Sequence, residues 1–243
     1  DIELISQQAR ESLGEALKAF HEGDVDSAQR ALGLTRPVDI THDKAFEDLV
    51  NAGEAHDLPV RDIFAYLRAI YVLLRVSDQA ENIAHETLFS VAGETKNPKV
   101  YRILFVDRGN DCRSQVAEAY ARKAFPECGS FNSAGWDPAD SLRPEALPFF
   151  EDHGLSVEEL EPKPLPDLME EPKHFHVIIG LDEKSREMIG EMPYKTVFLD
   201  WDLGPCPFGE NDPNALDRLE GLYREIATRM RDLMEILRGP DAL

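Results

Sequence analysis

The chain has 243 residues, 42% of them hydrophobic, and carries 47 acidic against 26 basic side chains, a formal net charge of −21 at pH 7. This length and apolar content suit one large domain or two small ones with a buried core. The negative charge repels phosphate backbones and anionic membranes, which argues against nucleic-acid binding. No apolar run is long enough to span a bilayer, and no signal-like segment follows Asp1, so we expect no membrane insertion.

Residues 1–95 show the apolar spacing that is typical of helices. A first helix carries an apolar stripe made of Ile2, Ile5, Ala9, Leu13, Leu17 and Phe20. Gly23 and Asp24 break the chain, and we expect a short helix over 25–32, a connector "TRPVDIT" around Pro37, and a further helix over 42–55. A long helix follows Pro59 and reaches Val91. The sequence therefore predicts a helical domain over 1–95, a bundle of three long helices.

Residues 100–243 have a different period, and the polar segment "AGETKNPKV" marks the boundary. Four strand-like runs, "YRILFVD", "SFNSAG", "HFHVIIGLD" and "KTVFLDW", alternate with helix-like segments. A last helix is expected from Pro213 to Leu237. Strands alternating with helices predict a doubly wound α/β domain with a four-stranded parallel sheet.

The turn after the first strand, "DRGNDCRS", lies at the carboxyl end of the sheet, where ligands bind in such folds. Gly109 allows a tight backbone, Arg113 supplies a cation, and Ser114 suits a helix N-cap. Loop N–H groups and a helix N-terminus together make an anion site. The alternative is a loop that only connects a strand to a helix. The candidate anion-binding residues are Arg108, Gly109, Asn110, Asp111, Cys112, Arg113 and Ser114.

The run "GNDCRSQVAEAYARKAF", followed by "NSAGWDPADSLRPEALPFFEDHGLS", resembles the low-molecular-weight protein tyrosine phosphatases, and within them the thioredoxin-coupled arsenate reductases. The resemblance covers about residues 100–240. The family signature is a nucleophilic Cys, five residues, then Arg and Ser. Arg113 and Ser114 match it, but the position of the nucleophile holds Asp107. A carboxylate there repels a dianion and is a weaker nucleophile than a thiolate.

Two further positions depart from what the resemblance implies. The general acid of the family is the Asp of an Asp-Pro pair, but here Gly204 precedes Pro205. Asp212, before Pro213, is a displaced candidate for that acid or simply a helix N-cap, and we favour the cap. The arsenate reductases also carry two resolving cysteines in a segment that here reads "GLDEKSREMIGEMP" and contains none.

These departures favour a non-catalytic signalling or regulatory protein, a pseudoenzyme in which Asp107 acts as a built-in anion and pairs with Arg113 or Arg108. Cys112 is then a packed thiol rather than a nucleophile. One alternative is an active phosphatase or arsenate reductase with altered residues. Another is a sensor that binds an oxyanion (phosphate, sulfate or arsenate) without turnover.

The helical half, through "FHEGDVDSAQRAL" and "LLRVSDQAENIAHE", resembles one three-helix repeat of the phosphate-signalling protein PhoU. Such repeats bind metal through acidic residues four apart, but here Leu74 takes the first position and Asp78 remains. A weaker metal set consists of Asp78, Glu81 and His85, and we prefer to interpret it as a solvated polar stripe. PhoU proteins have two repeats, so one repeat implies a homodimer.

The three cysteines, Cys112, Cys128 and Cys206, are odd in number and have no spacing pattern. This argues against a disulfide framework or a zinc site and for a reducing cytoplasm. We expect no cofactor.

Overall fold

The computed structural model describes the chain apart from residues 96–98, 170–174, 194, 209–213 and 239–243. Its contacts divide it into two compact units, Asp1–Asn97 and Pro98–Leu243, which are described separately. None of the described helices is both long and apolar enough to cross a membrane.

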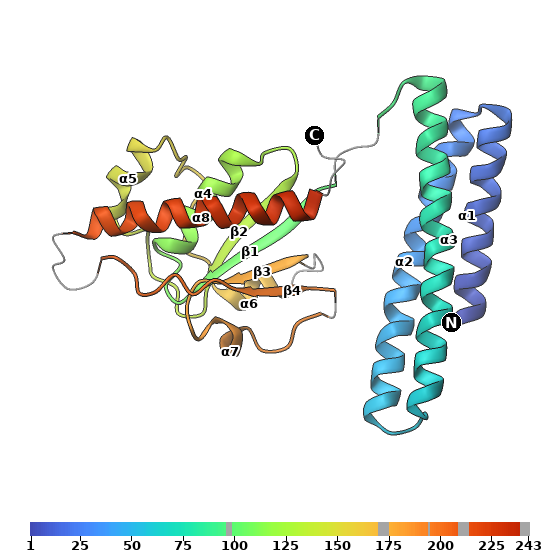
Figure 1. Cartoon of the computed structure of the whole chain (residues 1–243), viewed down its shortest axis with the longest axis horizontal. Coiled ribbons are helices and arrows are strands. Elements are labelled where there is room, and N and C mark those ends of the chain that lie inside the picture. The colour runs from blue at the N-terminus through green and yellow to red at the C-terminus, as the bar shows by residue number, and fades with distance from the viewer. Residues whose placement is uncertain (96–98, 170–174, 194, 209–213, 239–243) are drawn as a thin grey trace. The chain divides into compact units, whose positions relative to one another are not determined.

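The first unit is a bundle of three helices, as predicted: α1 (Ile2–Glu22), α2 (Val25–Glu54) and α3 (Val60–Ala92) (Figure 1). Alanines fill much of its interior, which lets the helix axes approach closely. The alanines of one buried cluster are Ala16, Ala19, Ala28, Ala31, Ala80 and Ala84. At the chain start a second cluster packs Ile5 against Val38 and Ile70.

The helix α2 corrects one expectation, because it continues through Pro37 where the sequence predicted two helices and a connector. Proline removes one backbone hydrogen bond and disfavours a helix interior. Here Val38 and His42 are buried at the bundle interface, with 0% and 7% exposure. Burial of this face outweighs the local cost of the proline, so tertiary packing decides the length of α2.

The apolar stripe of α1 also differs from the prediction. Leu17 and Phe20 are 51% and 61% exposed, whereas the smaller Ala16 and Ala19 face the interior. The true stripe passes through Ser12, a residue whose hydroxyl donates to the carbonyl of Ala9 at 3.1 Å. A hydroxyl that donates a hydrogen bond within its own helix can be buried in a core. Because Ser12 is polar, the sequence pattern did not place it on the buried face of α1.

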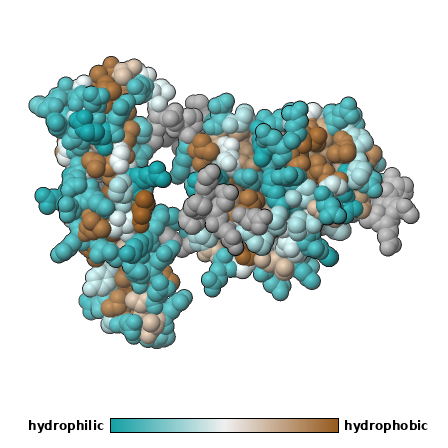
Figure 2. Space-filling model, turned by 180° about the vertical axis from the view of Figure 1, so that it is seen from behind, coloured by the Kyte–Doolittle hydropathy of each residue, from teal (hydrophilic) through white to brown (hydrophobic). Residues whose placement is uncertain are grey.

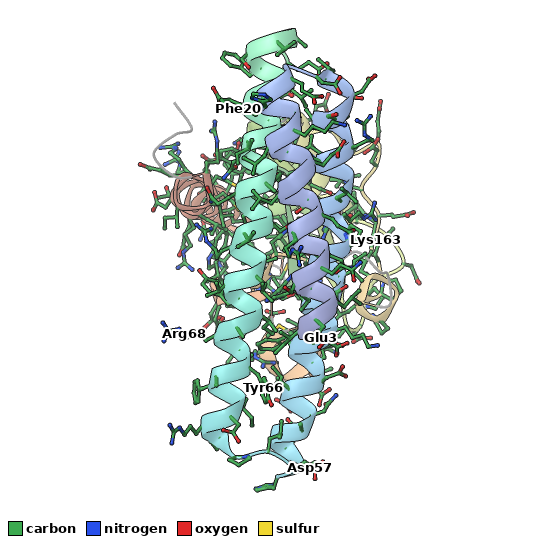
Figure 3. The ribbon with its side chains drawn as sticks, turned by 90° about the vertical axis from the view of Figure 1, so that its right-hand side faces the viewer. Glu3, Phe20, Asp57, Tyr66, Arg68 and Lys163 are labelled. Atoms are coloured by element: carbon green, nitrogen blue, oxygen red, sulfur yellow. The ribbon has the colours of Figure 1, made fainter. Side chains whose placement is uncertain are left out.

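The two longer helices extend beyond the start of α1. The helix α1 has 21 residues, whereas α2 and α3 have 30 and 33. Tyr66 and Asp57 lie beyond Glu3, toward the turn that joins α2 to α3 (Figure 3). Apolar side chains interrupt the hydrophilic surface of the bundle (Figure 2). The exposed ones on α3 include Val60, Phe64, Tyr66 and Tyr71.

The second unit is built on a four-stranded parallel sheet, as predicted, and the structure gives its strand order as β2-β1-β3-β4. The strands are β1 (Tyr101–Asp107), β2 (Gly129–Gly135), β3 (Val177–Gly180) and β4 (Val197–Asp200). Side chains along β1 point alternately to the two faces of the sheet, and both faces are buried. Ile103 and Phe105 belong to one hydrophobic cluster, and Leu104 and Val106 belong to another.

Helices cover both faces of this sheet (Figure 1). One face carries α4 (Arg113–Ala124), the 3-10 turn η1 (Pro144–Ala146), α5 (Leu147–Asp152) and α8 (Ala215–Arg238). The other carries α6 (Leu165–Met169), which the sequence did not predict, and α7 (Ser185–Ile189). The predicted start of the last helix, Pro213, lies outside the described residues.

This topology places the candidate loop at a switch point. The strand β1 lies between β2 and β3, and the chain leaves it toward α4 on one face of the sheet. In such sheets the crevice outside the carboxyl ends of the strands is where ligands bind. Asp107 is the last residue of β1, so the predicted anion loop lies in that crevice.

Candidate functional site: the loop after the first strand

The loop between β1 and α4 is held with its carbonyls turned outward. Asp137 and Ala139, which follow β2, donate their N–H groups to the carbonyls of Arg108 and Gly109 at 3.0 and 2.9 Å. The N–H of Arg143 donates to the carbonyl of Asp111 at 3.0 Å. Because these carbonyls are satisfied from outside, the geometry is that of a nest that favours a negative group within.

Asn110 sets the bend of the loop. Its φ of 48° is left-handed, a conformation that asparagine tolerates better than most residues. Its side chain is fully buried, and its Oδ1 accepts hydrogen bonds from the Lys163 N–H at 2.7 Å and from Gln115 Nε2 at 3.1 Å. Its Nδ2 donates to Ser114 Oγ at 2.9 Å. Asn110 thus joins the loop to the start of α4 and to the segment near Lys163.

The carboxylate of Asp107 occupies the interior of the loop. It is 2% exposed and accepts three hydrogen bonds. Oδ1 accepts from the Asn110 N–H and from the Ser114 hydroxyl, both at 2.8 Å, and Oδ2 accepts from the Ser114 N–H at 3.2 Å. N–H groups of the loop and of the first turn of α4 therefore donate to the Asp107 carboxylate, a group of the protein rather than a bound anion.

Arg113 is engaged by two carboxylates. Its Nε lies 3.7 Å from Asp107 Oδ2, and its NH2 donates to Asp182 Oδ1. Its NH1 donates to the carbonyl of Gly204. The Nε is buried and has no hydrogen-bond partner among the described residues. Two of its three guanidinium nitrogens therefore donate to internal partners, and the third, Nε, lies nearest to Asp107.

Asp182 is the second internal anion of the site. Besides Arg113, it accepts the backbone N–H of Arg108 at 2.8 Å. It lies just past β3, the strand that neighbours β1, so its carboxylate reaches across the crevice. Its own N–H donates to Ser185 Oγ at 3.1 Å, which fixes its position at the start of α7.

Burial and neighbouring charges shift the pKa values of Asp107 and Arg113. Burial raises the pKa of Asp107, even though Arg113, the Ser114 hydroxyl and the Asn110 N–H favour the charged form. Burial also opposes the charge of Arg113, but the carboxylates of Asp107 and Asp182 outweigh it and raise the pKa of the guanidinium. Arg113 is charged throughout, and its partners determine how much of that charge is available to a ligand.

A cavity of about 660 Å³ opens above the loop. Its lining contains four basic and five acidic side chains, so it has no excess of positive charge. The basic ones are Arg108, Arg113, Arg143 and Lys184, and the acidic ones are Asp107, Asp111, Asp137, Asp182 and Glu183. Arg108 pairs with Asp137 at 2.9 Å, and Arg143 pairs with Asp111 at 2.6 Å. Most of the positive charge in the cavity is therefore neutralised by carboxylates of the protein.

Cys112 is fully buried at the N-cap of α4, as the packed-thiol interpretation expects. Its thiol is hydrogen-bonded to that of Cys206, which lines the cavity from the segment after β4. This hydrogen bond, together with burial, raises the pKa of Cys112 well above its ordinary value. The same bond, the Phe208 N–H and the nearby Arg143 lower the pKa of Cys206 to about 7 despite partial burial.

The remaining candidates do not join this site. Asp212 lies outside the described residues. Asp78 pairs with Arg75 at 3.2 Å, and Glu81 pairs with His85 at 3.5 Å along α3. No group of three or more His, Cys, Asp or Glu side chains among the described residues could hold a metal ion. The structure therefore does not gather Asp78, Glu81 and His85 into a metal site, because their side chains form separate pairs within the helix.

Sequence reasoning missed several residues of the cavity. Asp182 follows the third strand directly, so the rule that ligands bind at carboxyl ends of strands could have singled it out. Arg143 and Cys206 come from irregular segments whose paths no local pattern indicates, and only the tertiary fold brings them to the loop.

The parallel sheet of order β2-β1-β3-β4, with loop N–H groups turned inward after β1, defines a doubly wound α/β protein with a candidate anion site. Residues 102–239 match the model of the family described as low molecular weight phosphotyrosine protein phosphatase. The match spans more than half of the chain, and the chain belongs to this family. Residues 2–87, within the helical bundle, match the model of the PhoU domain.

Solved structures with a similar fold include a thioredoxin-dependent arsenate reductase of Corynebacterium glutamicum, with 24% identity and a TM-score of 0.43, covering 66% of this chain and 74% of that one. A mutant of YwlE from Bacillus subtilis has 18% identity and a TM-score of 0.45, covering 56% and 99%. The tyrosine phosphatase Wzb from Escherichia coli K30, in complex with sulphate, has 19% identity and a TM-score of 0.42, covering 54% and 97%. No curated protein matches the chain.

Proposed function

We propose that this protein is a non-catalytic, phosphatase-like regulatory protein whose anion loop is filled by its own carboxylates. The observation that carries the proposal is the position of Asp107, which is 2% exposed and accepts the hydrogen bonds of Asn110 and Ser114. These are the donors that a bound oxyanion would need.

The chemistry of Asp107 supports the same conclusion. Three hydrogen bonds from the loop stabilise the Asp107 carboxylate where it lies and lower the electron density of its oxygens, which weakens it further as a nucleophile toward phosphorus. Its negative charge also repels a dianion. Phosphorylation of an aspartate needs a cation that neutralises the charges. The cation beside Asp107 is Arg113, which is shared with Asp182.

Asp182 extends the proposal to oxyanion sensing. A phosphate, sulfate or arsenate ion would compete with Asp182 for Arg113 and for the Arg108 N–H. Asp182 is more accessible than Asp107, with a side chain 21% exposed. It is therefore the carboxylate that a ligand would displace first, and we place any ligand of the loop at its position.

For the helical domain, residues 1–95, we propose a homodimer. Val60, Phe64 and Tyr71 are separated by four and seven residues, so they lie on one face of α3. They are 68%, 68% and 57% exposed. Val60 and Phe64 precede Tyr66 in α3, and Tyr66 lies beyond Glu3, toward the turn that joins α2 to α3 (Figure 3). A second copy that packs on this stripe would supply the second repeat that the resemblance to PhoU implies.

The boundary that we propose runs between this domain and the phosphatase-like domain, residues 100–243. The cytoplasm is the compartment that we propose, since Cys112, Cys128 and Cys206 are all free thiols.

An active enzyme is the second candidate, and the observation that favours it is the Cys206 thiol in the same cavity as Arg113. A thiol with a pKa of about 7 is a competent nucleophile near neutral pH. Hydrolysis of an aryl phosphate between about pH 5 and 8 separates the two candidates. We expect no turnover above background in the wild type. Turnover that is lost in both Arg113→Ala and Cys206→Ser would establish the enzyme and reject the non-catalytic proposal.

A further inference from the structure

The Cys112 and Cys206 thiols have no role in the proposed function, yet they meet at the edge of its cavity. Cys112 directly precedes Arg113 in the anion loop, and Cys206 follows β4, 94 positions further along the chain. The two thiols are hydrogen-bonded to each other. Cys206 faces the cavity, whereas Cys112 is fully buried behind it.

One arginine holds the two cysteine-bearing segments together. Arg143 Nε donates to Asp111 Oδ2 at 2.6 Å, next to Cys112, and its NH1 donates to the carbonyl of Phe208 at 2.8 Å. A second clamp is the bond from Arg113 to the carbonyl of Gly204, two residues before Cys206. These contacts hold the backbone next to each cysteine in place. The two sulfurs therefore stay near each other, which favours their reaction with each other.

We propose that Cys206 and Cys112 form a redox-active pair, with Cys206 as the peroxide-reactive thiol and Cys112 as the thiol that resolves it into a disulfide. Cys206 has the access that a peroxide needs, because it lines an open cavity. Cys112 has none, but it lies beside Cys206. Disulfides of cytoplasmic proteins are mostly of this reversible, sensing kind.

The reaction balances with a peroxide as the oxidant. The Cys206 thiolate attacks one oxygen of hydrogen peroxide, the O–O bond breaks, and hydroxide leaves to take up a proton, which yields a sulfenic acid. Cys112 then loses its thiol proton, its sulfur attacks the Cys206 sulfur, the S–O bond breaks, and water leaves. A small dithiol returns both cysteines to thiols by exchange and is itself oxidised to a disulfide.

The local electrostatics assign these two roles. The pKa of Cys206 is lowered to about 7, so about half of it is thiolate at neutral pH, against a few per cent for an ordinary thiol. The pKa of Cys112 is raised, because it donates its proton to Cys206 and is buried. The thiolate attacks the oxidant, and the protonated thiol waits until the sulfenic acid has formed.

Peptide mapping of the full chain tests the pair directly. Trypsin, which does not cut before proline, places the three cysteines on separate peptides, residues 109–113, 124–173 and 196–218. After a brief treatment with hydrogen peroxide, we expect a disulfide between 109–113 and 196–218 that a dithiol reverses. Cys128 is the internal control. A disulfide that involves Cys128, or oxidation of Cys206 without the bond to Cys112, would overturn the proposal.

Two variants at one position separate the roles. Cys112→Ser keeps a hydroxyl that can donate to Cys206 but removes the resolving sulfur, so a dimedone adduct should accumulate at Cys206 under peroxide. Cys112→Ala also removes the hydrogen bond, and alkylation of Cys206 near pH 7 should slow about threefold. Equal dimedone trapping in wild type and Cys112→Ser would show that Cys112 does not resolve the sulfenic acid.

Discussion

The guanidinium of Arg113 donates a hydrogen bond to the carboxylate of Asp182, a residue 69 positions further along the chain. The same carboxylate accepts the Arg108 N–H at 2.8 Å, so Asp182 bridges the loop backbone and the loop arginine. Asp107 fills the interior of the loop, and Asp182 takes the mouth. Two carboxylates of the protein, rather than one, therefore accept the hydrogen bonds of the loop and of Arg113.

The two anions predict how the loop can be opened. Removing Asp107 alone leaves Arg113 paired with Asp182, so Asp107→Asn should improve phosphate binding only modestly. The double variant Asp107→Asn, Asp182→Asn removes both competing charges. One charge at about 4 Å is worth about 4 kcal/mol at an effective dielectric of about 20, and a third of that shifts affinity about tenfold. Calorimetric titration should show that the affinity for phosphate increases from the wild type to the single variants and from these to the double variant.

A matched control for this series is Asp232→Asn, which removes the same formal charge from an exposed position on α8. Its phosphate affinity should equal that of the wild type. If the double variant binds phosphate no better than this control, the carboxylates do not guard the loop, and the internal-anion proposal is wrong.

The buried carboxyl of Asp107 also predicts a dependence of stability on pH. Burial raises its pKa in the folded state above the ordinary value of 3.8. Between these two values the folded chain holds a proton that the unfolded chain has released. The stability that Asp107 contributes is therefore fully present below the unfolded pKa and is lost as the pH rises through the raised folded pKa.

Urea unfolding of the wild type and Asp107→Asn at a series of pH values measures this effect. The free energy of unfolding of the wild type, minus that of the variant, should fall as the pH rises above about 4 and then level off. Asp107→Ser, which also lacks the titrating group, should give the same profile. A difference that stays constant or increases with pH would show that the pKa of Asp107 is not raised.

The sequence predicted the sheet well because its strands and helices have strong periods and each buries an obvious face. It also predicted the position of the loop, since a turn with Gly109 and Arg113 between a strand and a helix is a local pattern, but the N-cap of α4 is Cys112 and not Ser114. It failed where packing decides: α2 runs through Pro37 because Val38 and His42 are buried by other helices. It missed Asp182 as a partner of Arg113, because a contact across 69 positions leaves no periodic signal.

The close approach of β2 to the loop predicts a stability effect. A Cβ on Gly135 would lie 2.6 Å from the carbonyl oxygen of Arg108 and 3.1 Å from the backbone nitrogen of Asn110. Backbone atoms cannot move aside as a flexible side chain can, so Gly135→Ala should lower the free energy of unfolding by about 1–3 kcal/mol. Thermal or urea unfolding would measure the loss.

Gly14 is the matched control for that substitution. It lies in α1, and a Cβ there would meet nothing within 4 Å. Gly14→Ala should therefore stabilise the chain by up to about 1 kcal/mol through helix propensity. If Gly135→Ala is as stable as Gly14→Ala, the loop does not pack against β2 as closely as the structure indicates.

The exposed stripe on α3 predicts an effect on self-association. Val60, Phe64 and Tyr71 share one face of the helix, and a dimer that buries them would lose affinity when a charge enters the stripe. Sedimentation of the full chain at micromolar concentration should give a dimer for the wild type and a monomer for Phe64→Glu. Val72, 51% exposed on the same helix, lies about 80° or more around the axis from Phe64 and Tyr71, by 100° per residue, so Val72→Glu is the control and should remain dimeric. A wild-type monomer, or equal dissociation of both variants, would reject the stripe as the dimer interface.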